Sequence, residues 1–280
     1  HHPATVAAQV AQFDHMAKGR FVFGIGPGGL ASDMELYDVL DGEVRAGKMM
    51  ESIDIILKSW STEPPYKFDT QHYNFGIEET LIPELGVGTI AKPFQLPHPP
   101  IASTAMSPFS SSVTTAVKRG WSPMTANFCP PAVVASHWKK YVEGCQAIDK
   151  QPTGDDWKVS RNIVIAPTDS EARDHVLDPN GPNYFYFDYL WRVLKAADYT
   201  AVMKEDASVP DDEFTVEGLM ESMVVYGSPD TVTEKLKVLR EKTGPFGTLL
   251  LAMMDGSHGF EAHEQETMKL LAEDVAPQFG

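Results

Sequence analysis

Apolar side chains recur along this chain at two spacings, one typical of helices and one of buried strands. In residues 4–18 they lie three or four positions apart, at Val6, Val10, Phe13 and Met16, which predicts an amphipathic helix. The residues that follow are almost continuously apolar, as in parallel strands that are covered on both faces. Strands of this kind are predicted at 21–25, 100–105, 122–127, 161–166 and 248–253.

Helices are predicted between these strands. The strongest signals flank residues 229–243, where Ser228 offers a cap, Pro229 starts the helix and Gly244 ends it. Further helices are predicted at 41–60, 111–120, 131–148, 169–178 and 263–279. Residues 61–99, rich in proline, are predicted to be a long extended segment, and no regular element is predicted for 183–199 or 204–213. Strands that alternate with helices, without hairpin signals, indicate a parallel sheet with crossover helices.

Composition and charge narrow the class of protein. The chain has 280 residues, of which 42% are hydrophobic, enough for one large core of the size found in α/β barrels. The formal net charge is −16, so the surface should repel nucleic acid and anionic membranes. No apolar run approaches the roughly 18 residues of a membrane span. The charge says nothing about a small-molecule site inside the protein.

The cysteines and the first residues predict where the protein works. Cys129 and Cys145 form neither a CxxC pair nor a disulfide framework, which favours a reducing compartment. The sequence opens without the basic and then apolar stretch of a secretory signal. A soluble, cytoplasmic protein is therefore expected.

A glycine motif follows the first predicted strand. Gly24, Gly26 and Gly29 have the GxGxxG spacing of dinucleotide-binding loops. Such a loop needs a helix that opens on the last glycine, whereas a loop is predicted here, and the next predicted strand begins only near residue 100. Pro27 also lacks one of the N–H groups that would contact a pyrophosphate. The glycines are interpreted instead as a tight turn that leaves room for a ligand at the strand's carboxyl end.

A second candidate follows the strand at 100–105. Here the sequence STAMSPFSSSVTT leads through several serines into a predicted helix. Hydroxyls and free N–H groups at a helix N-terminus, after a parallel strand, can bind an anion such as phosphate. Serines at this position are equally typical of ordinary helix capping. The residues alone leave both interpretations open.

Several motifs together resemble one known family. They are HHPATVAAQVAQFDHMAKGRFVFGIGPGG, GEVRAGKMMESIDII, PIASTAMSPFSSSVTTAVKRG, GSPDTVTEKLKVL and TGPFGTLLLAM. In this order and spacing they are similar to the bacterial luciferase-like flavin monooxygenases, and in particular to the limonene 1,2-monooxygenase type. The resemblance extends over essentially the whole chain.

The resemblance implies a fold and an activity. The fold would be the (β/α)₈ TIM barrel of the bacterial luciferase type, as one domain over residues 1–280. The activity would be that of an FMNH₂- and O₂-dependent monooxygenase. In this family reduced FMN and O₂ form a flavin C4a-hydroperoxide, which oxygenates a terpene, aldehyde, ketone or similar apolar substrate. A separate flavin reductase, a two-component system and a homodimer are also implied.

The resemblance further implies site residues. The turn at Ser107, Pro108, Phe109, Ser110 and Ser112 matches the family's FMN phosphate turn, with Ser110 and Ser112 as the hydroxyl ligands. Arg45 matches an arginine near the phosphate in the luciferase α chain, and a charge-assisted contact to a phosphate is chemically apt. A Cys-Arg pair of that luciferase is replaced by Gly26-Pro27, which removes one cation from the phosphate side. Limonene-type members share this Gly-Pro-Gly pattern.

No catalytic residue is identified from the sequence. The family's barrel has three strands before the His-Pro element with which this sequence opens, so those strands, and the luciferase's catalytic histidine, are expected to be missing here. His258 lies just past the last predicted strand, at the end where barrel active sites form, and is a candidate pocket residue. A solvent-facing loop position is the alternative for His258. No metal site is expected, since no His, Cys or carboxylate set has metal-ligand spacing.

Two other functions remain open. One is an F420-dependent oxidoreductase of the same superfamily, which would use a deazaflavin in place of FMN. The other is a non-catalytic flavin-binding protein with a shortened barrel.

Overall fold

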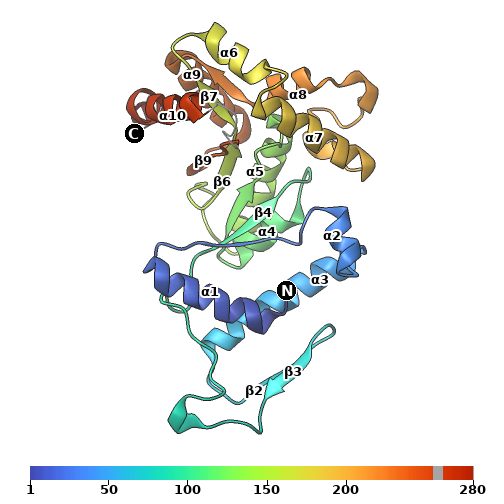
Figure 1. The fold of residues 1–280 in the computed structure, drawn as a ribbon, viewed down its shortest axis with the longest axis vertical. Helices are drawn as coiled ribbons and strands as arrows, with labels where there is room; N and C mark the ends of the chain where they lie inside the picture. The colour runs from blue at the N-terminus through green and yellow to red at the C-terminus, as the bar shows by residue number, and fades with distance from the viewer. Residues whose placement is uncertain (255–260, 280) are drawn as a thin grey trace. The chain divides into compact units, whose positions relative to one another are not determined.

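The computed structural model describes residues 1–254 and 261–279. The chain forms two compact units, an N-terminal unit of residues 1–102 and a C-terminal unit of residues 103–280. The elements are drawn in Figure 1, and each unit is described by itself.

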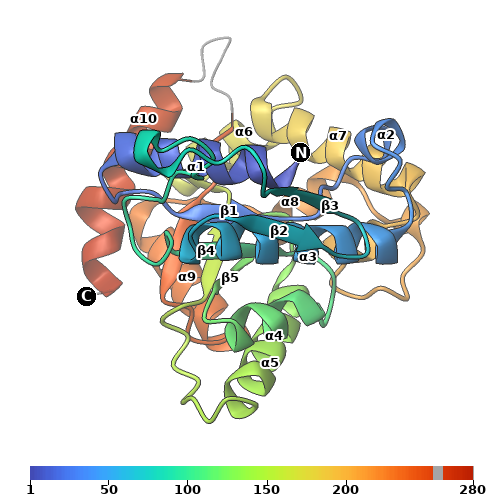
Figure 2. The same cartoon turned by 90° about the horizontal axis from the view of Figure 1, so that it is seen from below.

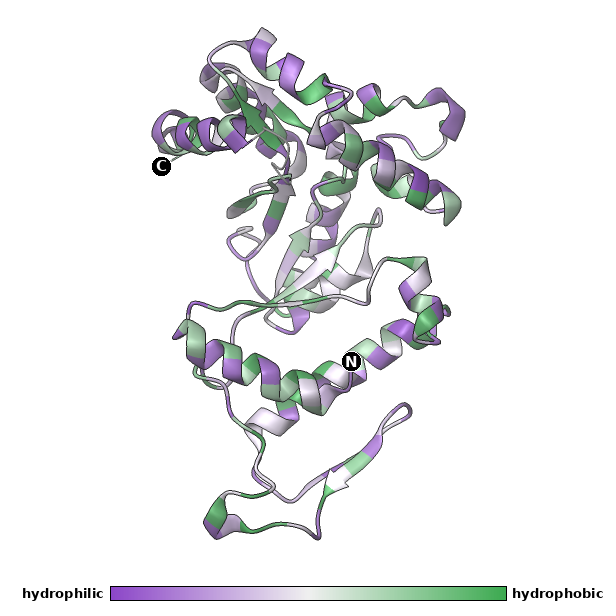
Figure 3. Cartoon of the chain, in the orientation of Figure 1, coloured by the Kyte–Doolittle hydropathy of each residue, from purple (hydrophilic) through white to green (hydrophobic). Residues whose placement is uncertain are grey.

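The N-terminal unit is built on two amphipathic helices. Polar and apolar stretches alternate along both of them (Figure 3), and the indole Nε1 of Trp60 donates to the Ala7 carbonyl at 3.3 Å. Asp14 is fully buried, and its carboxylate accepts two hydrogen bonds from Gln95. The elements are α1 (Pro3–Ala17), β1 (Phe23–Ile25), α2 (Ala31–Leu36), α3 (Gly42–Ser61), β2 (Tyr66–Asp69) and β3 (Asn74–Ile77).

Residues 61–99 contain a hairpin, so the prediction of a purely extended segment without hairpins is wrong. β2 and β3 pair antiparallel, with Tyr66 opposite Ile77. Their connection has neither the Asn-Gly nor the Asp-Gly that marks short hairpin turns. The Thr70 N–H closes it by donating to the Tyr73 carbonyl at 2.8 Å. Glu51 on α3 adds contacts from outside the turn: the Thr70 hydroxyl donates to the Glu51 carboxylate at 2.7 Å, and the His72 N–H donates to the same carboxylate. The turn is therefore held by its own backbone and by a partner on α3.

The C-terminal unit carries parallel strands with crossover helices, as the alternating pattern predicts. In the main sheet the order is β4-β5-β6-β9, and β7 pairs with β8 in a second, two-stranded sheet. β6 is parallel to both β5 and β9, and β7 is parallel to β8. The elements are β4 (Ile101–Ala105, whose first two residues belong to the N-terminal unit), α4 (Ser111–Lys118), β5 (Ser122–Thr125), α5 (Pro131–Gln146), β6 (Lys158–Arg161), β7 (Ile163–Ile165), α6 (Asp169–Leu177), α7 (Pro182–Ala196), α8 (Val216–Met223), β8 (Val225–Gly227), α9 (Pro229–Thr243), β9 (Thr248–Leu251) and α10 (Glu261–Leu270).

Some of these elements differ from the predicted ones. The aromatic-rich residues 183–199 are mostly helix α7, although aromatic side chains favour helices weakly. β6 does not show the apolar pattern of a buried strand, because three of the four residues in its sequence KVSR are polar. β8 was not predicted either, and it has only three residues. α9 begins after Ser228 and ends before Gly244, as predicted.

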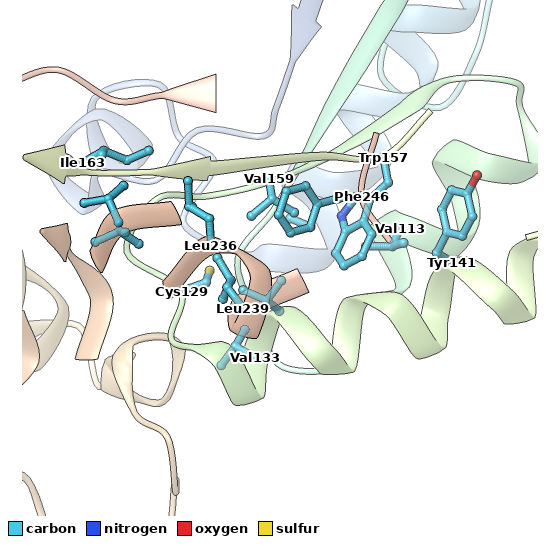
Figure 4. Close-up of a cluster of buried hydrophobic side chains, with 14 of the residues drawn as sticks. Val113, Cys129, Val133, Tyr141, Trp157, Val159, Ile163, Leu236, Leu239 and Phe246 are labelled. Atoms are coloured by element: carbon cyan, nitrogen blue, oxygen red, sulfur yellow. The ribbon is translucent and has the colours of Figure 1, made fainter. Parts of the chain in front are cut away.

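A buried aromatic cluster lies between the sheet, α5 and α9 (Figure 4). Trp157 has no exposed surface, and its ring stacks on Trp138 and Tyr141 at centroid distances of 5.7 and 6.4 Å. Phe246 meets Trp157 edge-on at 6.1 Å. Gly244, with φ of +121°, lets the chain pass this cluster, because a Cβ there would come within 2.6 Å of the Trp138 ring. The cluster fixes α5 against the sheet.

Candidate functional site

The turn between β4 and α4, residues 106–112, is called the serine turn below. Ser110 caps α4, since its Oγ accepts the Ser112 N–H, and the two hydroxyl oxygens lie 2.8 Å apart. The Ser112 hydroxyl donates to the Thr104 carbonyl at 3.1 Å. Helix capping is thus present in the structure. Whether the same hydroxyls also bind a phosphate remains a prediction.

In the part of the chain that the structure describes, the backbone of the serine turn exposes a free donor, the N–H of Ser111. Phe109 has a φ of +54°, a left-handed conformation that is uncommon for residues other than glycine. Ser111, at the first position of α4, has no acceptor for its N–H among the residues that the structure describes. A helix N-terminus with free N–H groups and nearby hydroxyls favours an anion. The turn therefore has the donor chemistry that a phosphate requires.

Helix α5 holds the serine turn from one side, and α4 and α5 lie side by side (Figure 2). The Phe109 N–H donates to the Ser136 hydroxyl at 2.8 Å, and His137 Nε2 lies 2.8 Å from the Ser107 carbonyl oxygen. The Cys129 thiol contacts the Met106 carbonyl at 3.4 Å. These contacts come from residues far along the chain, so sequence spacing alone did not reveal them.

The side chain of Ser107 faces a segment that follows α7. Its hydroxyl and the hydroxyl of Tyr199 form a hydrogen bond. The aromatic-rich stretch thus reaches the serine turn at its far end. Ser107, Pro108, Phe109, Ser110 and Ser112 lie in one turn, as their sequence order requires.

An amide cluster lies where β5 and β6 end. Asn127 Nδ2 donates to Asn162 Oδ1 at 2.7 Å and to the Tyr186 hydroxyl at 3.1 Å. Asn162 Nδ2 reaches Asn183 Oδ1 at 3.4 Å. Burial raises the pKa of Tyr186, so its phenol stays neutral and keeps its proton for hydrogen bonding. The sequence interpretation missed this cluster, because its three asparagines lie in separate segments of the chain and share no spacing.

Arg161 is a buried cation at the end of β6. It is 1% exposed, and its Nη1 donates to the carbonyls of Ser160 at 3.1 Å and of Asn127 at 3.4 Å. Burial lowers its pKa to about 10, so the guanidinium remains charged at neutral pH. This residue too was missed, since a basic residue inside a strand gives no apolar signal.

Arg45, the predicted phosphate cation, belongs to the N-terminal unit. Its Nη1 donates to the carbonyls of Val39 and Leu40 at 2.9 and 3.1 Å, while Asp41 caps the start of α3. The buried Nε of Arg45 has no partner among the residues that the structure describes. Its role toward a phosphate stays a prediction, and His258 lies outside the described residues.

The glycine stretch differs from the expectation in two respects. The short helix α2 begins at Ala31, soon after Gly29, where the pattern predicted a loop, and the next strand is β2, well before residue 100. The other objections to a dinucleotide loop hold: Pro27 lacks an N–H, and the next strand, β2, pairs antiparallel with β3 instead of completing a parallel βαβ unit. Gly28 has a φ of +83°, which favours glycine, although a Cβ added there would meet no atom of the other described residues within 4 Å.

Residues 1–254 and 261–279 contain neither a helix that could cross a membrane nor a group of metal ligands. Among the helices of these residues, none combines the length and the apolar character of a membrane-crossing segment. Within the same residues, no three side chains of His, Cys, Asp or Glu converge as metal ligands would.

The buried imidazole of His137 should make the fold less stable in acid. Burial lowers the pKa of His137 below its ordinary 6.5, so the unfolded chain takes up the proton first as the pH falls. The stabilisation is complete above pH 6.5 and is lost as the pH drops toward the folded-state pKa. Burial and the neighbouring His263 lower the pKa of His175 and add an effect of the same sign.

Urea unfolding between pH 8 and pH 5 measures this effect. The free energy of unfolding should fall more steeply below pH 6.5 in the wild type than in His137→Gln. Equal slopes for the two proteins would contradict this assignment.

Comparison with known proteins places these features in context. A family model described as luciferase-like monooxygenase matches residues 1–245. The 3,6-diketocamphane 1,6-monooxygenase of Pseudomonas putida is 29% identical, and the alignment covers 99% of this chain and 76% of the relative. The limonene 1,2-monooxygenase of Rhodococcus erythropolis is 25% identical over 100% of this chain and 66% of its own length.

Solved structures agree with these matches. The oxygenating constituent of 3,6-diketocamphane monooxygenase from Pseudomonas putida, a type II Baeyer-Villiger monooxygenase in complex with FMN, superposes with a TM-score of 0.83 at 27% identity. That likeness covers 99% of this chain and 76% of the other. An F420-dependent secondary alcohol dehydrogenase has a TM-score of 0.64 at 14% identity, over 96% of this chain and 75% of its own, which shows a shared fold alone.

Proposed function

The chain belongs to the luciferase-like monooxygenase family, and on this premise we propose that it uses reduced FMN and O₂ to oxygenate a small apolar substrate. The membership confirms the resemblance that the sequence motifs predict, and with it the luciferase-type barrel fold and the class of enzyme, a flavin-dependent monooxygenase. The substrate we propose is a terpene, an aldehyde or a ketone.

One observation carries this proposal. The structure with which the chain superposes at a TM-score of 0.83 is an oxygenase that holds FMN. The names of two aligned relatives point to diketocamphane and limonene, which are apolar cyclic compounds. An apolar cyclic substrate needs a dry pocket, and such a pocket also protects an activated oxygen species from water.

The residues of the serine turn fit an FMN phosphate. Ser107, Ser110 and Ser111 offer hydroxyls, the N–H of Ser111 has no acceptor in the described part of the chain, and the turn carries no carboxylate that would repel a dianion. The hydroxyls of Ser110 and Ser112 now bond to each other and can reorient toward a ligand. In our proposal they hold the phosphate, with Arg45 adding a positive charge.

The cofactor would supply the electrons for the reaction. Bound reduced FMN supplies two electrons, so that one oxygen atom of O₂ enters the substrate and the other leaves as water.

The residues near the strand ends have supporting roles in this proposal. The amide cluster of Asn127, Asn162 and Asn183 offers neutral hydrogen-bond donors and acceptors at the strand ends, where barrel active sites form. The neutral phenol of Tyr186 can donate there without adding charge.

The proposed partners follow from the two-component character of a relative. That relative's structure is described as an oxygenating constituent, one part of a larger system. We propose that a separate flavin reductase supplies FMNH₂ to this chain and that the chain works as a homodimer.

Cofactor-specific turnover tests the proposal. Purified protein, a flavin reductase, NADH and FMN should consume O₂ and convert members of a panel of terpenes, aldehydes and ketones. F420 should give no turnover, whether oxidised F420 is supplied with secondary alcohols or reduced F420 with ketones. Turnover with F420 and none with FMNH₂ would assign the chain to the deazaflavin branch, and flavin binding without any turnover would favour a non-catalytic flavoprotein.

A further inference from the structure

His137 joins two elements of the C-terminal unit in a buried position. It lies on α5, and its side chain has no exposed surface. Its Nε2 is 2.8 Å from the Ser107 carbonyl oxygen in the serine turn, and its Nδ1 is 3.0 Å from Thr125 Oγ1 at the end of β5. Both ring nitrogens are therefore in use.

The partners of His137 decide which nitrogen carries the proton. A carbonyl oxygen can only accept, so Nε2 must be the protonated nitrogen that donates to Ser107. Nδ1 then has a lone pair and accepts the Thr125 hydroxyl proton. Thr125 Oγ1 in turn accepts from Trp157 Nε1, a group that only donates, at 3.0 Å. A single chain of hydrogen bonds thus runs in one direction, from Trp157 through Thr125 and His137 to Ser107.

This series of hydrogen bonds ends at the Ser107 carbonyl, the backbone group that closes the serine turn. The Ser107 carbonyl also accepts the N–H of Ser110, the residue that caps α4, at 3.1 Å. Between them lies Phe109 in its left-handed conformation, which is strained for a residue with a Cβ atom. A strained residue persists only where its surroundings hold it. Here α5 holds both sides of it, with His137 at Ser107 and with Ser136 at the Phe109 N–H.

Burial keeps the ring of His137 neutral. It lowers the pKa of His137, and the positive charge of Arg161 acts in the same direction, while the hydrogen bond to the Ser107 carbonyl acts in the opposite one. The ring therefore adds no charge for a phosphate. Its contribution to the serine turn is one of geometry.

We propose that His137 is a positioning residue, which fixes the serine turn in the shape that binds the FMN phosphate by donating from Nε2 to the Ser107 carbonyl. This inference rests on the proposed function, because it needs FMN to bind through that turn. It assigns a role in cofactor recognition to a residue that would not touch the cofactor.

The test compares FMN with riboflavin, which has the same ring system without the phosphate. The quantity measured is the Kd for riboflavin divided by the Kd for FMN, each obtained by fluorescence or calorimetric titration. A larger ratio means a stronger preference for the phosphate. His137→Gln keeps an amide N–H at the position of Nε2, whereas His137→Asn is one methylene shorter and does not reach Ser107. The ratio should stay within about threefold of wild type in His137→Gln and fall about tenfold in His137→Asn, the size of one hydrogen bond.

A control and a second variant complete the experiment. Tyr141→Phe removes another buried polar group of α5, one turn beyond His137, and should leave the ratio unchanged. Where His137→Asn does not fold, His137→Leu removes both hydrogen bonds without burying an unpaired amide, and its ratio should also fall.

The outcomes separate the two claims. A wild-type protein that binds FMN and riboflavin equally would show that the phosphate is not recognised, and the proposed phosphate site would fail. A wild-type preference for FMN that persists in folded His137→Asn or His137→Leu would overturn the role of His137 alone. An equal loss of affinity for FMN and for riboflavin in these variants would likewise overturn the role of His137, since that result would indicate a residue that only supports the fold.

Discussion

Replacing Trp157 with alanine should lower the free energy of unfolding by about 3–5 kcal/mol, the range for a fully buried large aromatic side chain. Trp157 stacks on Trp138 and Tyr141 and meets Phe246 edge-on, so its removal leaves a cavity that three rings cannot close. The change would also remove the donor that satisfies Thr125. Urea unfolding followed by circular dichroism measures the loss.

Trp157→Phe is the matched control for this prediction. It keeps an aromatic ring in the cluster and removes the Nε1 donor, so the expected loss is smaller, about 1–2 kcal/mol. A loss below about 1 kcal/mol in Trp157→Ala would show that this cluster does not carry the stability of the C-terminal unit.

The double variant Ser112→Ala with Arg45→Ala should weaken FMN binding by about 2–4 kcal/mol, or about 30- to 700-fold. The reason is the loss of one or two charge-assisted hydrogen bonds to the phosphate. Riboflavin affinity should hardly change, because riboflavin has no phosphate. Titration of both flavins into wild type and variant measures the difference.

Arg45 also supports its own loop, so a control is needed for this variant. Its guanidinium donates to the carbonyls of Val39 and Leu40, and Arg45→Lys keeps the charge while losing part of that contact. The lysine variant should retain most of the FMN affinity. An unchanged FMN affinity in the folded double variant would remove Arg45 and Ser112 from the phosphate site.

The elements that the sequence predicts well are those with local signals. Ser228, Pro229 and Gly244 mark the ends of α9 with a cap, a first-turn proline and a terminal glycine, and the structure has these ends. The serine turn was likewise predicted as the link between a strand and a helix, and Ser110 does cap α4. In both cases the physical cause lies within a few residues of the feature.

The features that the sequence misses depend on distant partners. The connection of the β2–β3 hairpin lacks the Asn-Gly or Asp-Gly of short hairpin turns, and Glu51 from α3 helps to hold it. The hydrogen bonds from Trp157 to Thr125 and on to His137 join three separate segments of the chain. No spacing rule connects residues that are brought together only by the packing of a sheet against a helix.

The candidate site divides in the same way. Its direct phosphate contacts were proposed from motifs in one continuous stretch, whereas the contacts that hold the turn come from α5. His137 and Ser136 look from the sequence like ordinary positions of an amphipathic helix. Their role follows from the atoms of the turn that they face.

Oxygen labelling tests the central claim most directly. The protein is supplied with FMNH₂ from a reductase, under ¹⁸O₂ and in ordinary water, with a cyclic terpene or ketone that it converts, and the product is analysed by mass spectrometry. Our account predicts a product that carries one ¹⁸O atom, with formation that stops when FMNH₂ is withheld. A product that carries no ¹⁸O, or that forms equally without reduced flavin, would contradict it.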